Sequence, residues 1–375
     1  MSSLFETLGV NKEILKSLSG MGIQVPTPVQ QKVIGPFLQG GDLLVEAPTG
    51  TGKTCAFGIP VAQMMQREGR SPQALILSPT RELALQTTEV LRRLVQHLPG
   101  IRVAAVYGGE NIQRQMAALR QRPQIVVATP GRLVDLLGRG SVDLGHLRMV
   151  VLDEADRMLD MGFRQDLNRI MDRVPAKRQT VLLSATMSRE IKGVAERYQH
   201  RPQTIRIAPQ TLAADAITQY FARVQTGQKN AELLSLLTAK QYPLALVFVR
   251  TKRRASSLAL LLEKKGLRAG ALHGNMSQPQ RDRMMQKYRK GEVDVLVATD
   301  IAARGLDVHN IDAVINYDLP EDSDTYTHRI GRTGRAQHKG IALTFVDMAE
   351  EAKVRQIAQR SAVKLVPCGE LAAAL

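Results

Sequence analysis

Two segments of the chain combine small, hydroxyl and charged residues at spacings that could do chemistry. The first, at residues 47–54, reads Ala-Pro-Thr-Gly-Thr-Gly-Lys-Thr and follows the apolar run 43–45. Its small residues let backbone N–H groups point at phosphate oxygens, while Lys53 can reach the β and γ phosphates and the Thr54 hydroxyl can bind magnesium. The strict pattern has Gly at position 47, where this chain has Ala. We predict a phosphate-binding loop between a strand and a helix that begins near Lys53.

The second segment places two carboxylates at the end of an expected strand. Asp153 and Glu154 come directly after the apolar run 149–152. In nucleoside triphosphatases an acidic residue here binds magnesium, and a neighbouring group orients or deprotonates the attacking water. Carboxylates at a strand end can also be solvated turn residues. The presence of Lys53 and Thr54 in the same chain favours a catalytic role. We therefore assign Asp153 to the metal and Glu154 to the water.

Two arginines near the C-terminus could complete such a site. Arg332 and Arg335 lie three residues apart, and we predict that they share one side of a helix. Guanidinium groups that reach a γ-phosphate stabilise charge during phosphoryl transfer. A basic helix that only contacts nucleic acid has the same spacing, so the spacing alone leaves both interpretations open.

The net charge points to a polyanionic partner. The formal charge is +16, and both halves contribute: residues 1–208 contain 27 Lys and Arg against 18 Asp and Glu, and residues 209–375 contain 24 against 17. Such an even excess fits a nucleic acid that lies across two domains, although it also fits simple solubility. Aromatic residues make up only 4% and Trp is absent, which favours contacts with the sugar-phosphate backbone over base stacking.

Other bulk features indicate a cytoplasmic protein. No apolar run approaches the roughly 20 residues that a membrane span needs, and the first residues lack the shape of a secretion signal. The two cysteines, Cys55 and Cys368, have no metal-type spacing. We expect a reducing compartment and no membrane partner.

Short apolar runs alternate with longer segments of helical spacing, such as 81–98 and 164–173. Runs that are apolar on both faces are typical of parallel strands covered by helices. The expected strands are 43–45, 74–77, 103–106, 125–128, 149–152, 180–183 and 203–207, then 244–249, 269–272, 293–298, 313–316 and 340–345. We predict an α/β fold with an N-terminal domain at 1–208, a linker at 209–215 and a C-terminal domain at 216–375.

These segments belong to an ordered series of motifs. The series comprises Phe5 with 22–30, then 47–54, 79–84, Gly108 with Gly109, 129–132, 153–156, 184–186, 247–250, Gln280 with Arg283, 298–307 and 328–335. It resembles the motifs of DEAD-box RNA helicases of superfamily 2, over nearly the whole chain, and most closely a bacterial-type minimal core. The resemblance implies two tandem RecA-like domains, each a mostly parallel sheet flanked by helices, with ATP and Mg²⁺ as cofactors.

The resemblance also implies a nucleotide site. The ATP-binding residues would be Phe5, Gln30, Pro48, Thr49, Gly50, Thr51, Gly52, Lys53, Thr54, Gly305 and Asp307. The Gln30 amide would pair with the adenine edge and select ATP over GTP, and Phe5 would pack over the base; as a bare residue, Gln30 could equally be a helix-surface glutamine. Position 23, commonly aromatic in the family, is Ile here. The implied catalytic residues are Lys53, Asp153, Glu154, Arg332 and Arg335, with Thr54 and Asp153 at the metal.

Further residues would couple the nucleotide to RNA. The implied coupling residues are Asp156, Ser184, Ala185, Thr186 and His328, although the hydroxyls could also belong to an ordinary turn. The implied RNA contacts are Arg81, Gly109, Thr129 and Arg132 in the first domain and Arg250, Gly274, Arg283 and Thr299 in the second. They follow strands, where doubly wound sheets bind ligands, and they suit phosphate and 2′-OH recognition without sequence readout.

We therefore expect an ATP-dependent RNA helicase that binds single-stranded RNA across two domains and opens short duplexes when the domains close. Two alternatives remain: an ATP-gated RNA clamp or remodelling scaffold with little unwinding, and a DNA helicase. The chain ends soon after the second expected core, which leaves open a minimal protein or a shortened one. Protein partners and the physiological RNA cannot be inferred from these residues.

Overall fold

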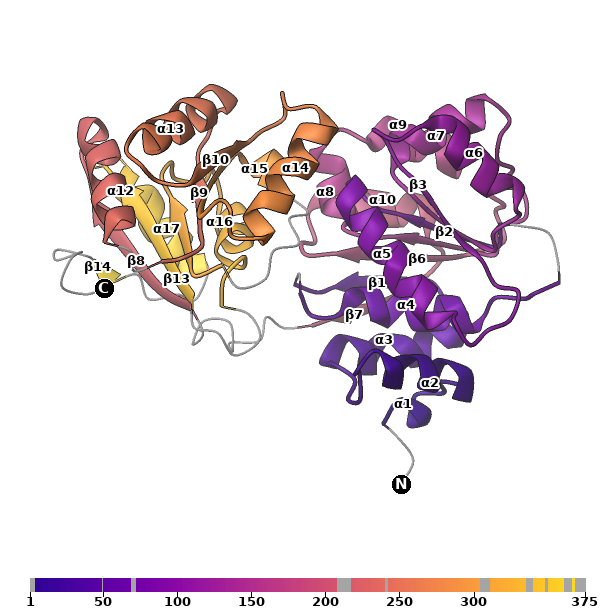
Figure 1. Cartoon of the computed structure of the whole chain (residues 1–375). Coiled ribbons are helices and arrows are strands. Elements are labelled where there is room, and N and C mark those ends of the chain that lie inside the picture. The colour runs from indigo at the N-terminus through magenta and orange to yellow at the C-terminus, as the bar shows by residue number, and fades with distance from the viewer. Residues whose placement is uncertain are drawn as a thin grey trace. The chain divides into compact units, whose positions relative to one another are not determined.

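The computed structural model describes residues 4–48, 50–68, 72–207, 217–239, 242–303, 311–334, 340–347, 350–360 and 366–367. The chain divides into two compact units, Met1–Pro209 and Gln210–Leu375, each with its own sheet and helices (Figure 1). The predicted linker at 209–215 lies outside the described residues, so its bounds stay a prediction. Each unit is an α/β domain with a parallel sheet, which confirms the predicted fold class.

The sheet of unit 1 has seven parallel strands in the order β3-β4-β2-β5-β6-β1-β7 among the described residues. The strands are β1 Leu43–Glu46, β2 Ala74–Leu77, β3 Val103–Val106, β4 Ile125–Ala128, β5 Met149–Leu152, β6 Gln179–Ser184 and β7 Gln203–Arg206. All seven predicted strands of this half are present, with ends that differ by one residue at most. Continuous apolar runs were a reliable signal because most of these strands are buried on both faces.

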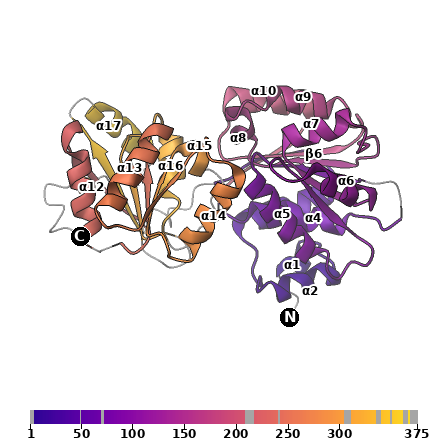
Figure 2. The same ribbon diagram turned by 45° about the horizontal axis from the view of Figure 1, so that its top comes forward.

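Helices cover both faces of this sheet. They are α1 Leu4–Thr7, α2 Lys12–Gly20, α3 Pro28–Leu38, α4 Lys53–Gln63, α5 Arg81–Leu94, α6 Ile112–Arg120, α7 Pro130–Gly138, α8 Ala155–Asp160, α9 Arg164–Met171 and α10 Arg189–Tyr198. Figure 2 shows α7 to α10 on one side of β6, and α4 and α5 on the other. Successive strand residues alternate between the two cores, so that Leu43 and Val45 pack with α4 and α5 while Leu44 faces the opposite core.

Local caps fix where the site-bearing helices begin. The Thr80 hydroxyl accepts a hydrogen bond from Leu83 N at 3.3 Å and thereby starts α5 directly after β2. Pro130 occupies the first turn of α7, where its missing N–H costs nothing. Because each cap lies at the carboxyl end of a strand, the residues between strand and helix stay at that edge of the sheet.

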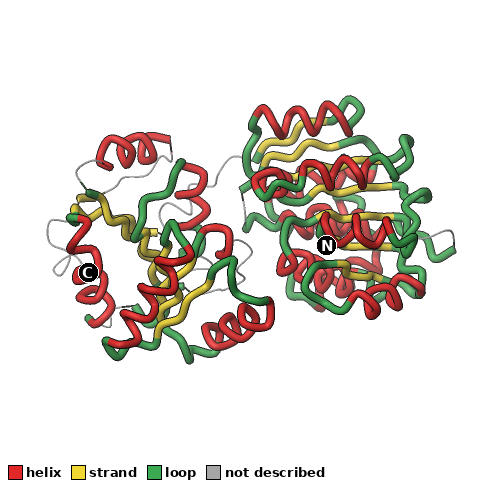
Figure 3. The backbone as a smooth tube through the Cα atoms, turned by 90° about the horizontal axis from the view of Figure 1, so that it is seen from above, coloured by secondary structure: helices red, strands yellow, loops and turns green. Residues whose placement is uncertain are grey.

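Unit 2 repeats this architecture with its own sheet, in the order β10-β11-β9-β12-β13-β8-β14 among the described residues. Its strands are β8 Ile217–Arg223, β9 Ala245–Phe248, β10 Ala269–Leu272, β11 Val295–Ala298, β12 Ala313–Asn316, β13 Gly340–Val346 and β14 Val366–Pro367. Its helices are α12 Lys229–Thr238, α13 Lys252–Lys264, α14 Gln278–Arg289, α15 Asp300–Ala303, α16 Ser323–Ile330 and α17 Glu351–Arg360, with a 3₁₀ turn at Thr226–Gln228. Figure 3 shows strands of each unit with helices running beside them.

Two strands of unit 2 had no predicted counterpart. Strand β8 reads Ile-Thr-Gln-Tyr-Phe-Ala-Arg, with buried residues at 217, 219 and 222 and accessible residues between them. A search for continuous apolar runs overlooks this mixed pattern. Strand β14 has only two residues and pairs with β8, so no sequence period could mark it.

The prediction that Arg332 and Arg335 share a helix is wrong for Arg332. Helix α16 ends at Ile330, and Arg332 lies in the turn that follows, with its N–H donating to Arg329 O at 3.2 Å. Gly334 then has a φ of 68°, which stops helical continuation. Thr333 is tied to Ile311 by a bridge and by a hydrogen bond from its hydroxyl to the Ile311 carbonyl. Arg335 lies outside the described residues.

Across the described part of the chain, no helix combines the length and apolar character that crossing a membrane requires.

Candidate functional site

The carboxyl edge of the unit 1 sheet gathers the predicted nucleotide residues. Strands β5, β6 and β1 are neighbours in the sheet. The phosphate loop follows β1, Asp153 follows β5, and Ser184 ends β6. The loop is also joined directly to this strand end, because Ala47 N donates to Ser184 O at 3.0 Å. Three segments distant in sequence therefore meet at one edge, as doubly wound sheets bring ligand-binding residues together.

The phosphate loop is held in a defined conformation. Gly50 and Gly52 have φ values of 78° and 92°, which favour glycine. Lys53 is buried, and its ammonium donates to Ala47 O at 2.8 Å. The Thr51 hydroxyl donates to Pro48 O at 2.9 Å. The Ala47 side chain packs entirely within the core, which explains why this departure from the strict glycine is accommodated.

Gln30 links the start of α3 to the phosphate loop. Its Oε1 accepts from Thr27 N at 3.0 Å and its Nε2 donates to Gly52 O at 3.2 Å. A Cβ added at Gly52 would lie 2.7 Å from Gln30 Nε2, so only glycine permits this approach. The amide thus touches the loop directly, and any contact between Gln30 and adenine stays a prediction.

Asp153 carries a buried carboxylate that is poorly compensated. Its side chain is 2% exposed, and no described residue donates a hydrogen bond to its Oδ1. The pKa of Asp153 is raised to about 7, chiefly by burial and next by the Glu154 carboxylate, while the Lys53 ammonium opposes the rise. A divalent cation would supply the missing positive charge, and Oδ1 would be one of its ligands. The residues therefore fit Mg²⁺, which commonly takes one or two carboxylates plus phosphate oxygens and water.

Glu154 occupies the turn between β5 and α8. Its backbone is left-handed, with φ 50° and ψ 53°, and it is the residue that precedes the helix. Its Oε2 accepts a hydrogen bond from Arg157 Nη1 at 2.6 Å. Sequence analysis did not single out Arg157, although a basic residue three positions after Glu154 was a usable signal.

Asp156 joins the turn that follows strand β5 to the segment that follows β6. Its Oδ2 accepts from Ala185 N at 2.9 Å, from Thr186 N at 3.1 Å and from the Thr186 hydroxyl at 3.3 Å. The Ser184 hydroxyl donates to Thr186 O at 2.7 Å, which tightens the same turn. The predicted contact of Asp156 with this turn is present, and its coupling role stays a prediction.

The predicted RNA residues of unit 1 lie beside this site, after strands β2, β3 and β4. Arg81 Nη1 donates to Gly109 O at 3.3 Å, and its guanidinium lies 5.0 Å from the centre of the Tyr107 ring. Arg132 donates from both Nη1 and Nη2 to Glu110 O at 3.1 Å. Thr129 N donates to Val106 O at 2.8 Å. The structure thus brings these residues together around the loop that follows β3.

In unit 2 the predicted RNA residues also follow adjacent strands. Arg250, Gly274 and Thr299 come after β9, β10 and β11, which are neighbours in the sheet. Arg250 N donates to Asp318 Oδ2 at 2.8 Å. Arg283 lies apart from them on α14, exposed to solvent, with its Nε donating to Pro279 O at 3.3 Å.

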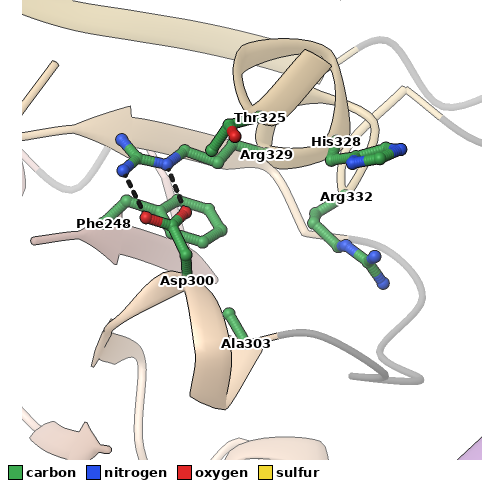
Figure 4. A pocket seen from close by; sticks show the side chains of 7 residues that line it. All are labelled: Phe248, Asp300, Ala303, Thr325, His328, Arg329 and Arg332. Carbon is green, nitrogen blue, oxygen red and sulfur yellow. Dashed lines mark hydrogen bonds and ion pairs between the residues drawn. The ribbon is translucent and has the colours of Figure 1, made fainter. Parts of the chain in front are cut away.

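Arg329 forms a buried network in unit 2 that sequence analysis did not single out. Its guanidinium binds both oxygens of Asp300, at 2.6 and 2.8 Å, and also donates to Asn316 Oδ1 and Asp318 O. Arg329 and Asp300 both line a pocket of about 30 Å³, together with Phe248, Ala303, Thr325, His328 and Arg332. Figure 4 shows His328 and Arg332 projecting away from the ion pair. Arg329 therefore holds α15 to α16, while His328 and Arg332 line the same pocket outside this ion pair.

Family models cover both units. Residues 27–194 match a model described as DEAD/DEAH box helicase, and residues 228–337 match one described as Helicase conserved C-terminal domain. The chain is 45% identical to the ATP-dependent RNA helicase CshA of Listeria monocytogenes, over 97% of this chain and 70% of that protein. It is 42% identical to the DEAD-box ATP-dependent RNA helicase CshA of Geobacillus kaustophilus, over 96% of this chain and 77% of that protein.

The chain belongs to the DEAD-box family of ATP-dependent RNA helicases.

Solved structures agree with this membership. One is Saccharomyces cerevisiae Dbp5 bound to RNA and ADP BeF3, with a TM-score of 0.88, 31% identity and coverage of 100% of this chain and 98% of that one. Another is a DEAD box protein from the hyperthermophile Methanococcus jannaschii, with a TM-score of 0.55, 37% identity and coverage of 97% and 98%.

For several residues of the DEAD-box motifs, the expected contact with the nucleotide stays a prediction. Thr49, Gly305 and Asp307 lie outside the described residues. Phe5 is 1% exposed and packs in the core of unit 1, so its contact with adenine is untested. Ile23 is partly buried against the same core.

Proposed function

We propose that this DEAD-box protein binds single-stranded RNA through both units and locally unwinds short RNA duplexes, driven by Mg²⁺-dependent ATP hydrolysis. One observation carries the proposal: at a single edge of the unit 1 sheet, the phosphate loop, the buried and poorly compensated Asp153 carboxylate and Glu154 lie together. Next to them lie Arg81 and Arg132. An ATP site and a phosphate-binding surface thus share one rigid scaffold.

The residues of the ATP site would divide the work of phosphoryl transfer. Lys53 would exchange its bond to Ala47 O for the β and γ phosphates, as backbone N–H groups of the loop hold their oxygens. Thr54 and Asp153 would hold Mg²⁺, which when bound neutralises charge on the phosphate oxygens. Glu154 would orient the attacking water. Arg332 and Arg335 would contribute the positive charge that the transition state needs from the second unit.

The coupling would run through the turn that Asp156 holds. Because Asp156 receives three hydrogen bonds from Ala185 and Thr186, a shift of the Asp153 turn on nucleotide binding would move the segment after β6. In unit 2, His328 and Arg332 flank the Arg329 network and would respond to the γ-phosphate together. We propose that RNA and ATP favour the same closed state.

RNA recognition would be independent of sequence. The proposed contacts are arginines, backbone groups of glycine turns and threonine hydroxyls, which suit phosphates and 2′-OH groups. Dbp5, the structural relative bound to RNA and ADP BeF3, supports this assignment. The CshA relatives, whose names state ATP-dependent RNA helicase, support the activity. We also propose that the protein acts in the cytoplasm, the location expected from its sequence.

Multiple-turnover separation of a short RNA duplex tests the proposal. With ATP and Mg²⁺ we expect strand separation, and with the Glu154→Gln variant we expect a stable complex with ATP and RNA and little turnover. Strong RNA-stimulated hydrolysis without any separation would instead support an ATP-gated clamp. Normal turnover by Glu154→Gln would refute the role of Glu154.

The choice of nucleic acid needs its own comparison. We expect single-stranded RNA to stimulate hydrolysis far more than DNA of the same sequence, because 2′-OH contacts distinguish the two. Equal stimulation by both would contradict the RNA assignment.

A further inference from the structure

Arg157 forms a short ion pair with Glu154, the residue proposed to orient water. Its Nη1 lies 2.6 Å from Glu154 Oε2, and the side chains are only 11% and 15% exposed. Arg157 stands in the first turn of α8, whereas Glu154 precedes that helix with a left-handed backbone. One helical turn therefore carries both partners.

This burial separates the pair from ordinary surface ion pairs. The Arg93–Glu89 pair on α5 has side chains that are both 59% exposed, and such pairs contribute little because water screens them. A buried, charge-assisted hydrogen bond is shorter and roughly twice as strong as a neutral one. The carboxylate of Glu154 is thus restricted to the rotamer that Arg157 can reach.

We propose that Arg157 is a positioning residue that holds the Glu154 carboxylate in the orientation required to align the attacking water. The inference rests on the proposed role of Glu154. The transition state of phosphoryl transfer is loose, so placement of the nucleophile contributes more than the basicity of the group that holds it. An arginine bound to the carboxylate is compatible with that task.

The decisive variants are Arg157→Met and Arg157→Lys. Methionine keeps most of the apolar stem and removes the charge, while lysine keeps the charge on a shorter and less directional donor. The matched control is Arg169→Met, because Arg169 and Asp166 form an i, i+3 pair on α9 with a longer separation of 3.8 Å. Each protein is assayed as the full chain for RNA-stimulated ATP hydrolysis, for ATP affinity by a fluorescent analogue, and for thermal stability.

We expect Arg157→Met to lower kcat about ten- to a hundredfold, the cost of a misplaced reacting group, with KM for ATP and analogue affinity unchanged. Arg157→Lys should recover part of kcat, and Arg169→Met should match the wild type. In single-turnover assays of the Glu154→Gln background, Arg157→Met should have no further effect, because the group it positions is already lost.

Other results would overturn the inference. An unchanged or higher kcat in Arg157→Met would show that the ion pair is neutral or inhibitory. A loss of kcat that comes with an equal loss of analogue affinity or of folded protein, and that Lys does not rescue, would assign Arg157 a structural role. These outcomes differ from failure of the proposed function, in which Glu154→Gln itself would retain normal turnover.

Discussion

Replacing Asp153 by Asn should stabilise the ligand-free protein, and only at neutral and alkaline pH. Burial raises the pKa of Asp153 from 3.8 to about 7, so the folded protein binds this proton more tightly than the unfolded chain does. The resulting destabilisation is absent below pH 3.8, grows between pH 3.8 and pH 7, and is constant above pH 7. At 1.36 kcal/mol for each pKa unit, it amounts to about 2 kcal/mol at pH 5 and about 4 kcal/mol at pH 8.

The asparagine introduces a cost of its own, because its buried amide N–H groups need partners; an unsatisfied group costs about 1–3 kcal/mol. The net gain in unfolding free energy at pH 8 is therefore about 1–3 kcal/mol. The amide cost does not depend on pH. The difference between variant and wild type should consequently grow by about 2–3 kcal/mol from pH 5 to pH 8.

Urea unfolding of the full chain, followed by circular dichroism in the presence of a chelator, measures this difference at each pH. Hydrogen exchange of the β5 amides assigns the change to unit 1. The exposed Asp172→Asn change is the control and should show no such trend. Adding ATP and Mg²⁺ should reverse the order, since only the wild type gains the stabilisation of a bound ligand. A difference that stays constant between pH 5 and pH 8 would refute the reasoning about burial.

Three further changes address other parts of the structure. Gly52→Ala should weaken ATP binding in an analogue-fluorescence assay, because alanine is strained at the φ of 92° and its Cβ would displace the Gln30 amide from the loop, whereas Gly41→Ala, with nothing within 4 Å, should bind normally. Asp156→Asn weakens the hydrogen bonds that this side chain accepts from the turn after β6, and it should reduce strand separation more than ATP hydrolysis. Equal losses in the two assays would count against a coupling role. Arg329→Met removes one partner of a buried ion pair and should cost unit 2 about 3–5 kcal/mol in urea unfolding, and a change below about 1 kcal/mol would show that Asp300 is already well solvated.

The sequence located most of the fold because strand and loop signals in this chain are local. Continuous apolar runs marked the parallel strands, and the glycines of 47–54 marked a turn. The failures have equally local causes. Strand β8 mixes buried and accessible residues. Arg332 lies beyond the end of α16, where Thr333 is bound to Ile311, and a contact so distant in sequence is not encoded in residue spacing.

The sequence alone indicated the residue types for phosphate and metal chemistry, because a glycine-rich loop with Lys53 and Thr54 occurs together with carboxylates after a second apolar run. The tertiary structure decided what compensates each charge. Lys53 donates a hydrogen bond to a carbonyl, and Asp153 Oδ1 accepts none from the described residues. Glu154 forms an ion pair with Arg157, and Arg329 forms one with Asp300. Burial and partner geometry arise only when strands distant in sequence become neighbours, and they determine which charged groups bind a ligand and which support the fold.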